Sequence, residues 1–394
     1  MELKPGYKQT EAGVIPEDWE VKTLQDLCKE EISYGIVQCG PHVEGGIPYI
    51  RVSDMEGPVL NRDRMLCTSI QIASRFRRSE VRHGDIVYAL RGRLGDVRVV
   101  PAELDGANLT QGTARISPSN IVQSTFLFWA LRNPEVVLRA CSESKGTTFM
   151  EITLSDLRQI KLALPPQIEQ SRISLILSDF EASLTALDLE IEKKRNIKQA
   201  AMQELLTGKR RLPGFEGEWE VKRLGDLAHI KTGSRNNEDK NEDGEYPFFV
   251  RSDNVERINS YSYDCEAILV PGEGRIGEIF HYVNGRFDVH QRVYAITQFK
   301  PGISGKFVHS YMAMNFGAWA MQNTVKATVD SLRLPTFQAF EMLVPPTENE
   351  QDAIAAVLSE MDAELAALEA RLKKARDLKH GMLQELLTGR IRLK

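Results

Sequence analysis

An internal repeat constrains the fold of this chain more than any other feature of its sequence. The segment Trp19-Glu-Val-Lys-Thr-Leu-Gln-Asp-Leu27 returns as Trp219-Glu-Val-Lys-Arg-Leu-Gly-Asp-Leu227, and seven of the nine residues are identical. Two further blocks recur in the same order: a Pro-Pro pair followed by Glu-Gln, at 165–170 and 345–351, and Gln-Glu-Leu-Leu-Thr-Gly, at 203–208 and 384–389. The chain is therefore one structural unit written twice.

Between these blocks the two copies differ in most residues but keep a few landmarks in the same order. The matched landmarks are Ser53-Asp54 with Ser252-Asp253, Arg93-Leu-Gly95 with Arg275-Ile-Gly277, and Gln111 with Gln291. This pattern predicts two heads that share a fold and differ in surface, which is what two readers of different sequences would need.

Each copy ends in a predicted long helix with an a/d seam. Apolar residues alternate four and three apart, at Ile173, Leu177, Phe180, Leu184, Leu187 and Ile191, and at Ile354, Leu358, Met361, Leu365, Leu368 and Leu372. The pattern runs from the Pro-Pro pairs to Gly208 and Gly389, so each helix spans about 40 residues or roughly 60 Å. A single such helix would lie on its own domain, but two matched seams can bury each other. We therefore expect an intramolecular coiled coil with acidic, solvated or partner-facing outer faces.

The remaining segments are predicted to form two globular heads of short strands, loops and a few helices, an α+β class. Apolar runs at 48–52, 85–90, 247–250 and 267–270 predict strands, and 126–131 predicts a buried helix. The expected organisation is an N-terminal arm (1–18), a first head (19–160), a central helical spacer (161–208), a linker (209–218), a second head (219–343) and a distal helical spacer (344–394).

Composition and charge exclude several classes of protein. No segment approaches the roughly 20 apolar residues of a membrane span, and residues 1–5 lack the basic and apolar regions of a secretory signal, so we expect a cytoplasmic globular protein. The five cysteines include no C-x-x-C pair and have no histidine cluster nearby, which predicts reduced, mostly buried thiols and no metal site. The net charge is −5, so any surface that binds a polyanion must be local.

The first head carries a local excess of arginine. Residues 51–100 contain ten arginines and no lysine, against six acidic residues. Arginine's planar fork suits phosphate groups and guanine edges, so the cluster indicates contact with DNA, although surface ion pairing is an equal alternative for any one arginine. The candidate DNA-binding residues of this head are Arg51, Ser53, Arg77, Arg78, Arg91, Arg93 and Gln111.

The second head cannot bind DNA by charge alone, because residues 219–343 hold 14 Lys and Arg against 16 Asp and Glu. Its candidates are loop residues whose side chains can read base edges. They are Lys231, Ser234, Arg235, Asn236, Arg251, Arg275, Gln291 and Arg292. Ser and Asn are also common in turns, so a structural interpretation stays open for them.

The sequence contains no convincing catalytic machinery. Gly272-Glu-Gly-Arg-Ile-Gly277 fits the G-x-G-x-x-G spelling of a dinucleotide or methyl-donor loop, but residues 278–283 predict a strand, so no helix N-terminus would face a phosphate. A hairpin turn is the better interpretation. Motifs for amino-group methylation, for a phosphate-binding loop and for nuclease chemistry are not evident, and seven scattered histidines form no catalytic set. The chain is predicted to be a binder.

Together these residues give the chain a close resemblance to the specificity subunit of type I DNA restriction-modification systems. The resemblance covers essentially the whole chain, and it rests on residues 7–19, the core from Gly84-Asp-Ile to Gly92-Arg-Leu-Gly95, Leu164-Pro-Pro-Gln-Ile-Glu-Gln170 and the two Gln-Glu-Leu-Leu-Thr-Gly helix ends. It implies two target recognition domains, one for each half of a split asymmetric DNA site. It further implies two antiparallel helices that set the spacer and dock two methyltransferase subunits.

By the same resemblance, S-adenosylmethionine, and ATP with Mg²⁺, bind to partner subunits, which include an adenine methyltransferase and a translocase and nuclease subunit. This chain would bind double-stranded DNA and none of these cofactors, and would not be an enzyme. Two alternatives stay open: the recognition chain of a related modification system without ATP-dependent cleavage, and a coiled-coil adaptor whose heads bind proteins. Salt-sensitive, sequence-selective DNA binding would argue against the adaptor.

Overall fold

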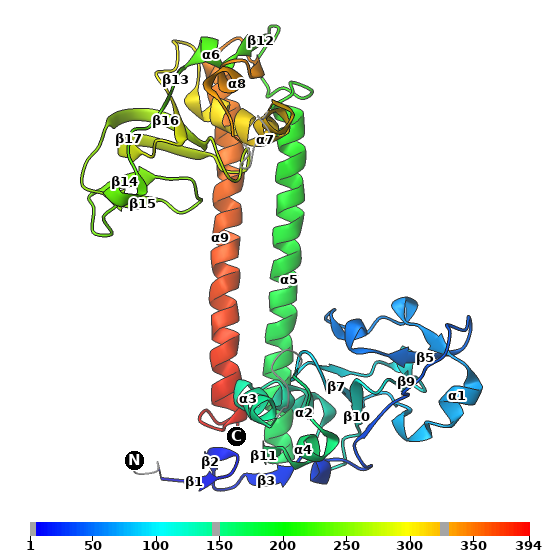
Figure 1. Ribbon diagram of the computed structural model, residues 1–394. Coiled ribbons are helices and arrows are strands. Elements are labelled where there is room, and N and C mark those ends of the chain that lie inside the picture. The colour runs from blue at the N-terminus through cyan, green and yellow to red at the C-terminus, as the bar shows by residue number, and fades with distance from the viewer. Residues whose placement is uncertain (1–4, 144–149, 324–330) are drawn as a thin grey trace. The chain divides into compact units, whose positions relative to one another are not determined.

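Two compact units make up the chain in the computed structural model, which describes residues 5–143, 150–323 and 331–394 (Figure 1). Unit 1 contains residues 1–187 and 371–394, and unit 2 contains residues 188–370. Each unit holds one head together with parts of both long helices, so unit 1 is discontinuous in the sequence. Within the described ranges no helix is long and apolar enough to cross a membrane.

The two long helices are α5 (Gln167–Leu205), with 39 residues, and α9 (Glu348–Leu387), with 40 residues. Both begin within two residues of a Pro-Pro pair, because proline's fixed φ and missing N–H are tolerated at a helix start and not in its interior. Gly208 and Gly389 follow the helix ends with φ of +68° and +70°, the left-handed conformation that glycine adopts without strain. The predicted helices are therefore confirmed.

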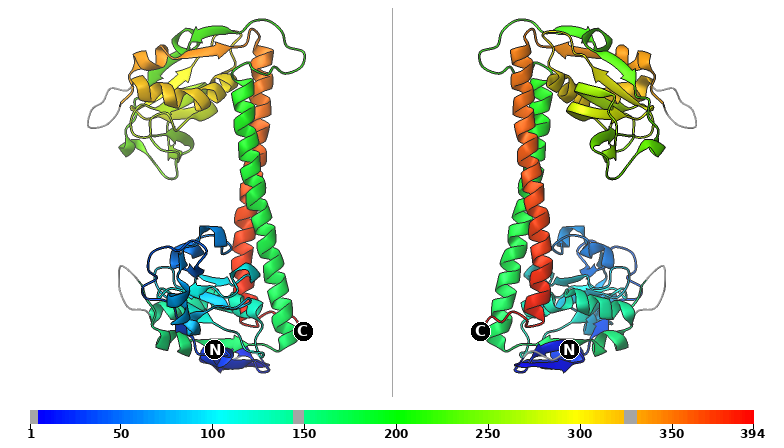
Figure 2. Two further views of the ribbon diagram at one scale, coloured as in Figure 1. Left: turned by 90° about the vertical axis from the view of Figure 1, so that its right-hand side faces the viewer. Right: turned by 90° about the vertical axis from the view of Figure 1, so that its left-hand side faces the viewer.

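Within each unit α5 and α9 lie side by side and run antiparallel (Figures 1 and 2). Lys379 pairs with Glu181 in unit 1, and Lys194 pairs with Glu364 in unit 2 at 2.6 Å. Seam residues are buried between the helices, namely Leu184, Leu187 and Leu372 in unit 1 and Ile191 and Leu365 in unit 2. Nearer the heads the seam changes partner: Ile173 and Leu177 join the core of head 1, and Ile354 and Leu358 pack with Phe307 of head 2. Part of the seam of each long helix thus faces the other long helix, and the rest packs on a head.

Head 1 is built from two small sheets and short helices. A four-stranded antiparallel sheet has the order β4 (Ser33–Tyr34), β10 (Thr113–Ile116), β7 (Ile86–Ala89), β8 (Val97–Val99). A three-stranded sheet has the order β6 (Cys67–Thr68), β5 (Ile47–Ile50), β9 (Asn108–Leu109), with β5 and β9 parallel. Its helices are α1 (Ile70–Ser74), α2 (Ser124–Leu131), α3 (Pro134–Ser142) and α4 (Leu154–Gln159). In the arm before the head, β1 (Tyr7–Thr10) pairs antiparallel with β2 (Gly13–Pro16). The strands predicted at 48–52 and 85–90 and the helix at 126–131 are confirmed.

Head 2 has one larger sheet in place of these two. Its strand order is β13 (His229–Thr232), β18 (Val293–Thr297), β16 (Tyr263–Pro271), β17 (His281–Val289), β14 (Tyr246–Phe249), β15 (Glu256–Ile258), and only β14 and β17 are parallel. Its helices are α6 (Leu224–Leu227), α7 (Gly305–Asn323) and α8 (Leu334–Gln338). The strands predicted at 247–250 and 267–270 are confirmed. The strand predicted from residue 278 begins only at His281, because the preceding residues form a turn with Gly274 and Gly277 in the left-handed conformation.

The five cysteines are free, and each is half-buried, whereas the sequence predicted mostly buried thiols. The reason lies in their positions, because Cys67 and Cys265 stand on β6 and β16 and Cys39 lies in a loop. Burial raises the pKa of Cys28 to about 12, so its thiol stays protonated at neutral pH.

The recurring tryptophan block forms the strand that attaches each head to its long helix. β3 (Glu20–Thr23) pairs antiparallel with β11 (Lys161–Leu164), and β12 (Glu220–Arg223) pairs antiparallel with β19 (Glu341–Val344). β11 and β19 lead directly into the Pro-Pro pairs. The block is repeated because both heads need the same junction.

The recurring glutamine holds each head to the start of its long helix. The Gln170 side chain accepts a hydrogen bond from the backbone N–H of Gln123 (2.9 Å) and donates to the carbonyl oxygen of the first proline (2.9 Å). Gln351 accepts from the N–H of Ser304 (2.9 Å) and donates to its own first proline (3.1 Å). Because these contacts match, they also establish that Gln123 and Ser304 occupy equivalent places.

The recurring glutamate binds an arginine that follows the end of the other long helix. Arg392 donates to both carboxylate oxygens of Glu169 (2.9 Å each), and Arg211 donates to both of Glu350 (2.9 and 2.6 Å). The Glu350 side chain is fully buried, and a buried carboxylate is stable only with such charge-assisted partners. We call these two contacts the helix clamps, one in each unit.

Candidate nucleic-acid interface

Four loops meet at one edge of each head. The parallel pairs β5 with β9 and β14 with β17 bring two strand ends to the same edge, since parallel strands point the same way. The loop of the neighbouring hairpin is tied there by a backbone hydrogen bond, from Leu90 to Gly112 in head 1 and from Gly272 to Arg292 in head 2 (2.9 Å each). We call this surface the loop edge; it comprises residues 36–46, 51–56, 90–96 and 110–112 in head 1, and 234–245, 250–255, 272–280 and 290–292 in head 2.

Glycine allows the first of these loops to cross the parallel strands. A Cβ atom on Gly35 would lie 1.9 Å from the carbonyl oxygen of Leu109, and one on Gly233 would lie 2.0 Å from that of Val289. The loop then hydrogen-bonds to the last turn, where the N–H of Gln291 donates to the carbonyl of Arg235 (2.8 Å). The loop edge therefore has the same backbone frame in both heads.

Four of the predicted residues of head 1 lie on its loop edge as exposed side chains: Ser53, Arg91, Arg93 and Gln111. The Arg91 guanidinium lies against Gly112, because a Cβ atom there would be 2.8 Å from its Nε and 3.2 Å from Val52. Among the described residues no carboxylate pairs with Arg91 or Arg93. Their charge is available to a ligand.

The other three predicted residues of head 1 are placed differently. Arg51 is on the loop edge, but it is half-buried and binds Asp54 at 3.0 and 2.7 Å, so its charge is largely neutralised. Arg77 and Arg78 are exposed on a 3₁₀ helix next to β4, where Arg78 stacks over the Tyr34 ring at 5.7 Å. The structure thus divides the arginine cluster. The expected ion pairing holds for Arg51, and the loop edge receives Arg91 and Arg93.

In head 2 the polar candidates of the first loop take two different roles. The Gln291 side-chain amide donates to Asn236 on the exposed loop edge, near Ser234. Arg235 turns inward, where its guanidinium binds the buried Asp288 (2.9 Å) and Ser260 (3.0 Å), so it supports the fold. Lys231 is exposed on β13, before this loop begins.

The arginines of head 2 are arranged around acidic residues. Glu273 binds Arg251 at 3.5 Å and Arg292 at 3.1 Å, and so holds two guanidinium groups side by side. Burial, together with the charges of these two arginines, lowers the pKa of nearby His290, which is therefore neutral at pH 7. Arg275 pairs with Asp253 and with Glu278 (2.8 Å). Head 2 therefore presents its guanidinium groups oriented and partly neutralised.

Three equivalent positions of the loop edge carry different residues in the two heads, and at one of them the charges are opposite. The landmarks that match Ser53 with Ser252, Arg93 with Arg275 and Gln111 with Gln291 also align the residues beside them. By this alignment Val52, Arg91 and Gly112 stand where Arg251, Glu273 and Arg292 stand in head 2. Sequence reasoning missed Glu273, although its place two residues before the Arg275 landmark was a readable signal. The charge at this position is inverted within a constant frame.

The G-x-G-x-x-G segment is the hairpin connection between the antiparallel strands β16 and β17, as predicted. A Cβ atom on Gly277 would lie 2.5 Å from Gly317 of α7, and one on Gly95 would lie 2.6 Å from Val137 of α3. The matched glycines are thus needed for close packing of the hairpin on a helix. In the part of the chain that the structure describes, no group of His, Cys, Asp or Glu is placed to hold a metal ion.

Comparison with known proteins assigns both copies to one family. The family model of the type I restriction modification DNA specificity domain matches residues 16–198 and again 216–375. The chain belongs to this family. Membership makes it a DNA sequence-specificity subunit of a type I restriction-modification system, as the resemblance in its sequence implied.

Relatives of this specificity subunit match over very different lengths. The putative type I restriction enzyme MjaX specificity subunit of Methanocaldococcus jannaschii is 24% identical, over 98% of this chain and 97% of its own. The type I restriction enzyme EcoBI specificity subunit of Escherichia coli is 30% identical, over 41% of this chain and only 34% of its own length. The crystal structure of the type I restriction-modification S subunit from M. genitalium has the same fold, with a TM-score of 0.65, 15% identity and 98% of both chains covered.

Proposed function

We propose that each head of this specificity subunit reads one half of a split DNA site through its loop edge, and that the chain itself performs no chemistry. The proposal rests on a contrast at the loop edge, where the backbone is the same in both heads and the side chains are not. The same contacts hold the backbone of the loop edge in both heads, whereas the side chains differ, down to opposite charges at Arg91 and Glu273. Readers of two different half-sites need this combination.

The residues on the two loop edges suit base reading in different ways. In head 1, Arg91 and Arg93 have the geometry for guanine edges or phosphate groups, and the Gln111 amide can pair with adenine. In head 2, Glu273 orients the guanidinium groups of Arg251 and Arg292. This fixed orientation offsets the lower net charge of head 2 in DNA binding. A bidentate arginine contact contributes about 1–3 kcal/mol of discrimination against the wrong base.

A single-molecule methylation map of host DNA, with the gene intact, deleted and restored on a plasmid, tests this function. We expect deletion to remove one split motif, two short defined halves around a fixed gap, and the plasmid copy to restore it. If the map stays the same although the methyltransferase subunit is expressed, the chain does not direct that modification.

Exchange of one head tests whether the heads act independently. Residues 19–160 are replaced by the corresponding head of a relative with a different known target, and the rest of the chain is kept. One half of the methylated motif should change, while the other half and the gap stay the same. A change in both halves would contradict independent reading.

We also propose that the long helices set the gap between the half-sites. A helix of 39 residues is about 58 Å long, comparable to one to two turns of DNA at about 34 Å per turn. Seven residues inserted after Leu184, with seven more after Ala375, keep the a/d seam in register and lengthen the pair by about 10 Å. The gap should then grow by about three base pairs at roughly 3.4 Å per base pair. An unchanged gap would refute this role.

We further propose that α5 docks the methyltransferase subunits, which would bind S-adenosylmethionine, while restriction subunits would bind ATP with Mg²⁺. Ile168, Leu175 and Leu189 are 69, 62 and 60% exposed and recur at multiples of seven residues, so they form one apolar stripe on this helix. Leu175→Lys with Leu189→Lys should abolish co-purification with the methyltransferase subunit and leave the melting temperature nearly unchanged. The matched control is Leu378→Lys on α9, also exposed, which should keep the complex.

A further inference from the structure

A tryptophan and an arginine of head 1 fill the space between that head and the long helices in unit 1. The Trp129 indole N–H donates to the Ser178 hydroxyl of α5 (3.1 Å), and the Arg132 guanidinium lies over the indole ring at 5.1 Å. Arg132 also pairs with Glu181 at 3.7 Å. Lys379 of α9 stands 5.5 Å from the indole and binds the same carboxylate. The ring thus contacts one hydroxyl and two cations, and one carboxylate binds both cations.

Unit 2 keeps the helix side of this arrangement. Equivalent residues of the two long helices are 181 positions apart in the sequence, as Gly208 and Gly389 or Gln170 and Gln351 are. The same step relates Ser178 to Ser359, Glu181 to Asp362, and Lys198 to Lys379. Lys198 and Asp362 form the ion pair that corresponds to Lys379 and Glu181. The hydroxyl, the carboxylate and one cation are therefore all in place in unit 2.

The head side of the arrangement is missing in unit 2. Gln123 and Ser304 make the same backbone contact with the recurring glutamine, so they are equivalent. Three residues later in each head, Phe126 and Phe307 are both fully buried, which supports this alignment. By the same alignment, Ser310 stands in the place of Trp129 and Ala313 in the place of Arg132. Neither small side chain can reach the place of the ring or of the guanidinium. A pocket of about 430 Å³ lies there instead, within the range of about 300–1,000 Å³ that ligand sites occupy.

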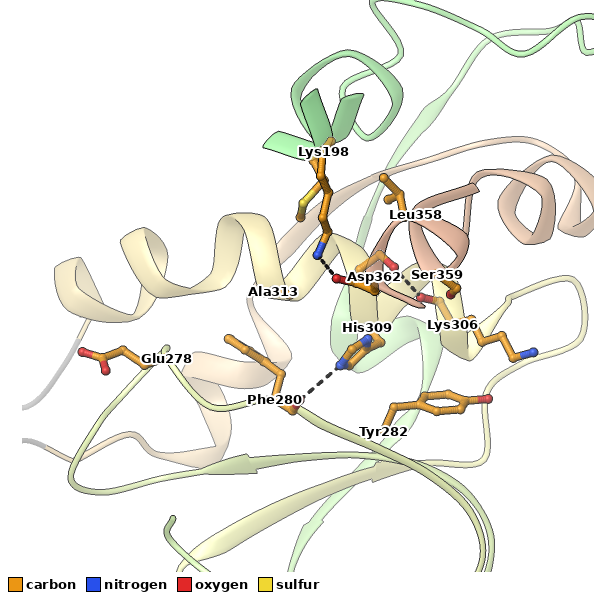
Figure 3. Close-up of a pocket in the computed structure, with 12 residues that line it drawn as sticks. Lys198, Glu278, Phe280, Tyr282, Lys306, His309, Ala313, Leu358, Ser359 and Asp362 are labelled. Carbon is orange, nitrogen blue, oxygen red and sulfur yellow. Dashed lines mark hydrogen bonds and ion pairs between the residues drawn. The ribbon is translucent and has the colours of Figure 1, made fainter. Parts of the chain in front are cut away.

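The walls of this pocket suit a ring beside a cation. Figure 3 shows Lys198 of α5 and Leu358, Ser359 and Asp362 of α9 on one side, with Phe280, Tyr282 and His309 of head 2 on the other. His309 contacts the Phe280 carbonyl oxygen at 3.2 Å, and burial lowers its pKa, so its ring is neutral at pH 7. Aromatic faces and an aliphatic side chain would cover a flat ring, while Asp362 offers a carboxylate to a cation.

We propose that this pocket is a socket for an aromatic ring and a neighbouring guanidinium group from another polypeptide, which take the places of Trp129 and Arg132 in unit 2. A polypeptide fits better than a small metabolite, because the two places are filled in unit 1 by residues three apart on one helical turn. One turn of a partner helix carries both groups at that spacing. The inference goes beyond DNA reading, because of the twelve residues that line the socket only Glu278 and Phe280 belong to the loop edge.

The test uses the peptide Trp-Ala-Ala-Arg-amide, labelled with a fluorophore at its N-terminus for anisotropy and acetylated there instead for calorimetry. The full-length wild-type chain should bind one peptide. The variant Ser310→Trp with Ala313→Arg fills the socket with the chain's own side chains and should bind at least tenfold more weakly, with a melting temperature at or above that of the wild type. Trp129→Ser with Arg132→Ala opens the matching space in unit 1 and should add a second site.

Two outcomes would overturn the proposal: no binding of the peptide to the wild type at millimolar concentration, or equal binding to the filled variant. Indole alone serves as the small-molecule arm. If indole binds the wild type as tightly as the peptide does, and does not bind the filled variant, the socket takes a small aromatic compound. The proposal of a polypeptide occupant is then wrong. Should the opened variant fail to fold, the filled variant still decides. DNA binding by the filled variant should equal that of the wild type, which separates this test from that of the reading function.

Discussion

Replacing Glu273 by glutamine tests whether this residue orients two arginines on the loop edge of head 2. The carboxylate binds Arg251 and Arg292, and it is less exposed, at 22%, than its partners at 44 and 58%. Ion pairs at such exposed sites contribute about 0–1 kcal/mol each to stability. Glu273→Gln should therefore leave the fold intact and alter binding.

The size of the binding effect follows from charge. Two arginines and one glutamate carry a net charge of +1, and the variant raises this to +2. One additional phosphate contact makes the slope of log K against log salt steeper by about 0.9. Between 50 and 200 mM salt, the affinity of the variant for DNA should fall about 3.5-fold more than that of the wild type. Discrimination at the second half-site should weaken, because the freed guanidinium groups lose their common orientation; a lost bidentate contact costs about 1–3 kcal/mol.

Glu278→Gln is the matched control for this prediction. It removes the same charge from the same loop, but Glu278 pairs with Arg275 and not with Arg251 or Arg292. Both variants are measured, with the methyltransferase subunit bound, on the target found by methylation mapping and on DNA with one altered half-site. A steeper salt slope in both variants, with lost discrimination only in Glu273→Gln, supports the reasoning. Equal discrimination by the two variants would refute an orienting role for Glu273.

Two further predictions concern the helix clamps. Arg211→Met leaves the buried Glu350 carboxylate without its cation and should destabilise unit 2 by about 3–5 kcal/mol in urea unfolding. Adding Glu350→Gln to this variant should recover much of the lost stability. A loss below about 1 kcal/mol for Arg211→Met would contradict the role of the clamp. In unit 1, burial raises the pKa of Glu169, but hydrogen bonds from Arg392 and Trp19 outweigh it and hold the pKa below its ordinary value of 4.5. The stabilisation is therefore complete above the ordinary pKa of 4.5 and is lost as the pH falls through the lowered pKa, so unfolding followed by circular dichroism should show a flatter pH dependence for Glu169→Gln below pH 4.5.

The long helices and the strands could be predicted because their signals are local. A heptad pattern, a Pro-Pro start and a glycine stop act within a few residues, so the bounds of α5 and α9 followed from the sequence. The discontinuity of unit 1 was less accessible, since it depends on contacts such as Arg392 with Glu169, more than two hundred residues apart.

The candidate site could be predicted only in part, because the direction of a side chain depends on tertiary contacts. Arg235 and Arg91 are both loop arginines, yet one binds a buried aspartate while the other lies exposed on Gly112. Arg98 is another member of the cluster, and it is half-buried and donates to the Gly57 carbonyl oxygen (2.9 Å). Charge counting could not separate these cases. Aligning the two copies position by position could, and it would also have shown Glu273 opposite Arg91.

The reciprocal form of the helix clamps explains which parts of the repeat stay identical within the chain. Each clamp joins the start of one long helix to the segment that follows the other, so every copy supplies one half of both clamps. A change in the Glu-Gln pair or in the segment after the glycine stop would therefore weaken a contact made with the other copy. The loop edge has no such reciprocal partner, because its contacts stay within one head. Its side chains can change one head at a time, and the inverted charge at Arg91 and Glu273 is a change of this kind.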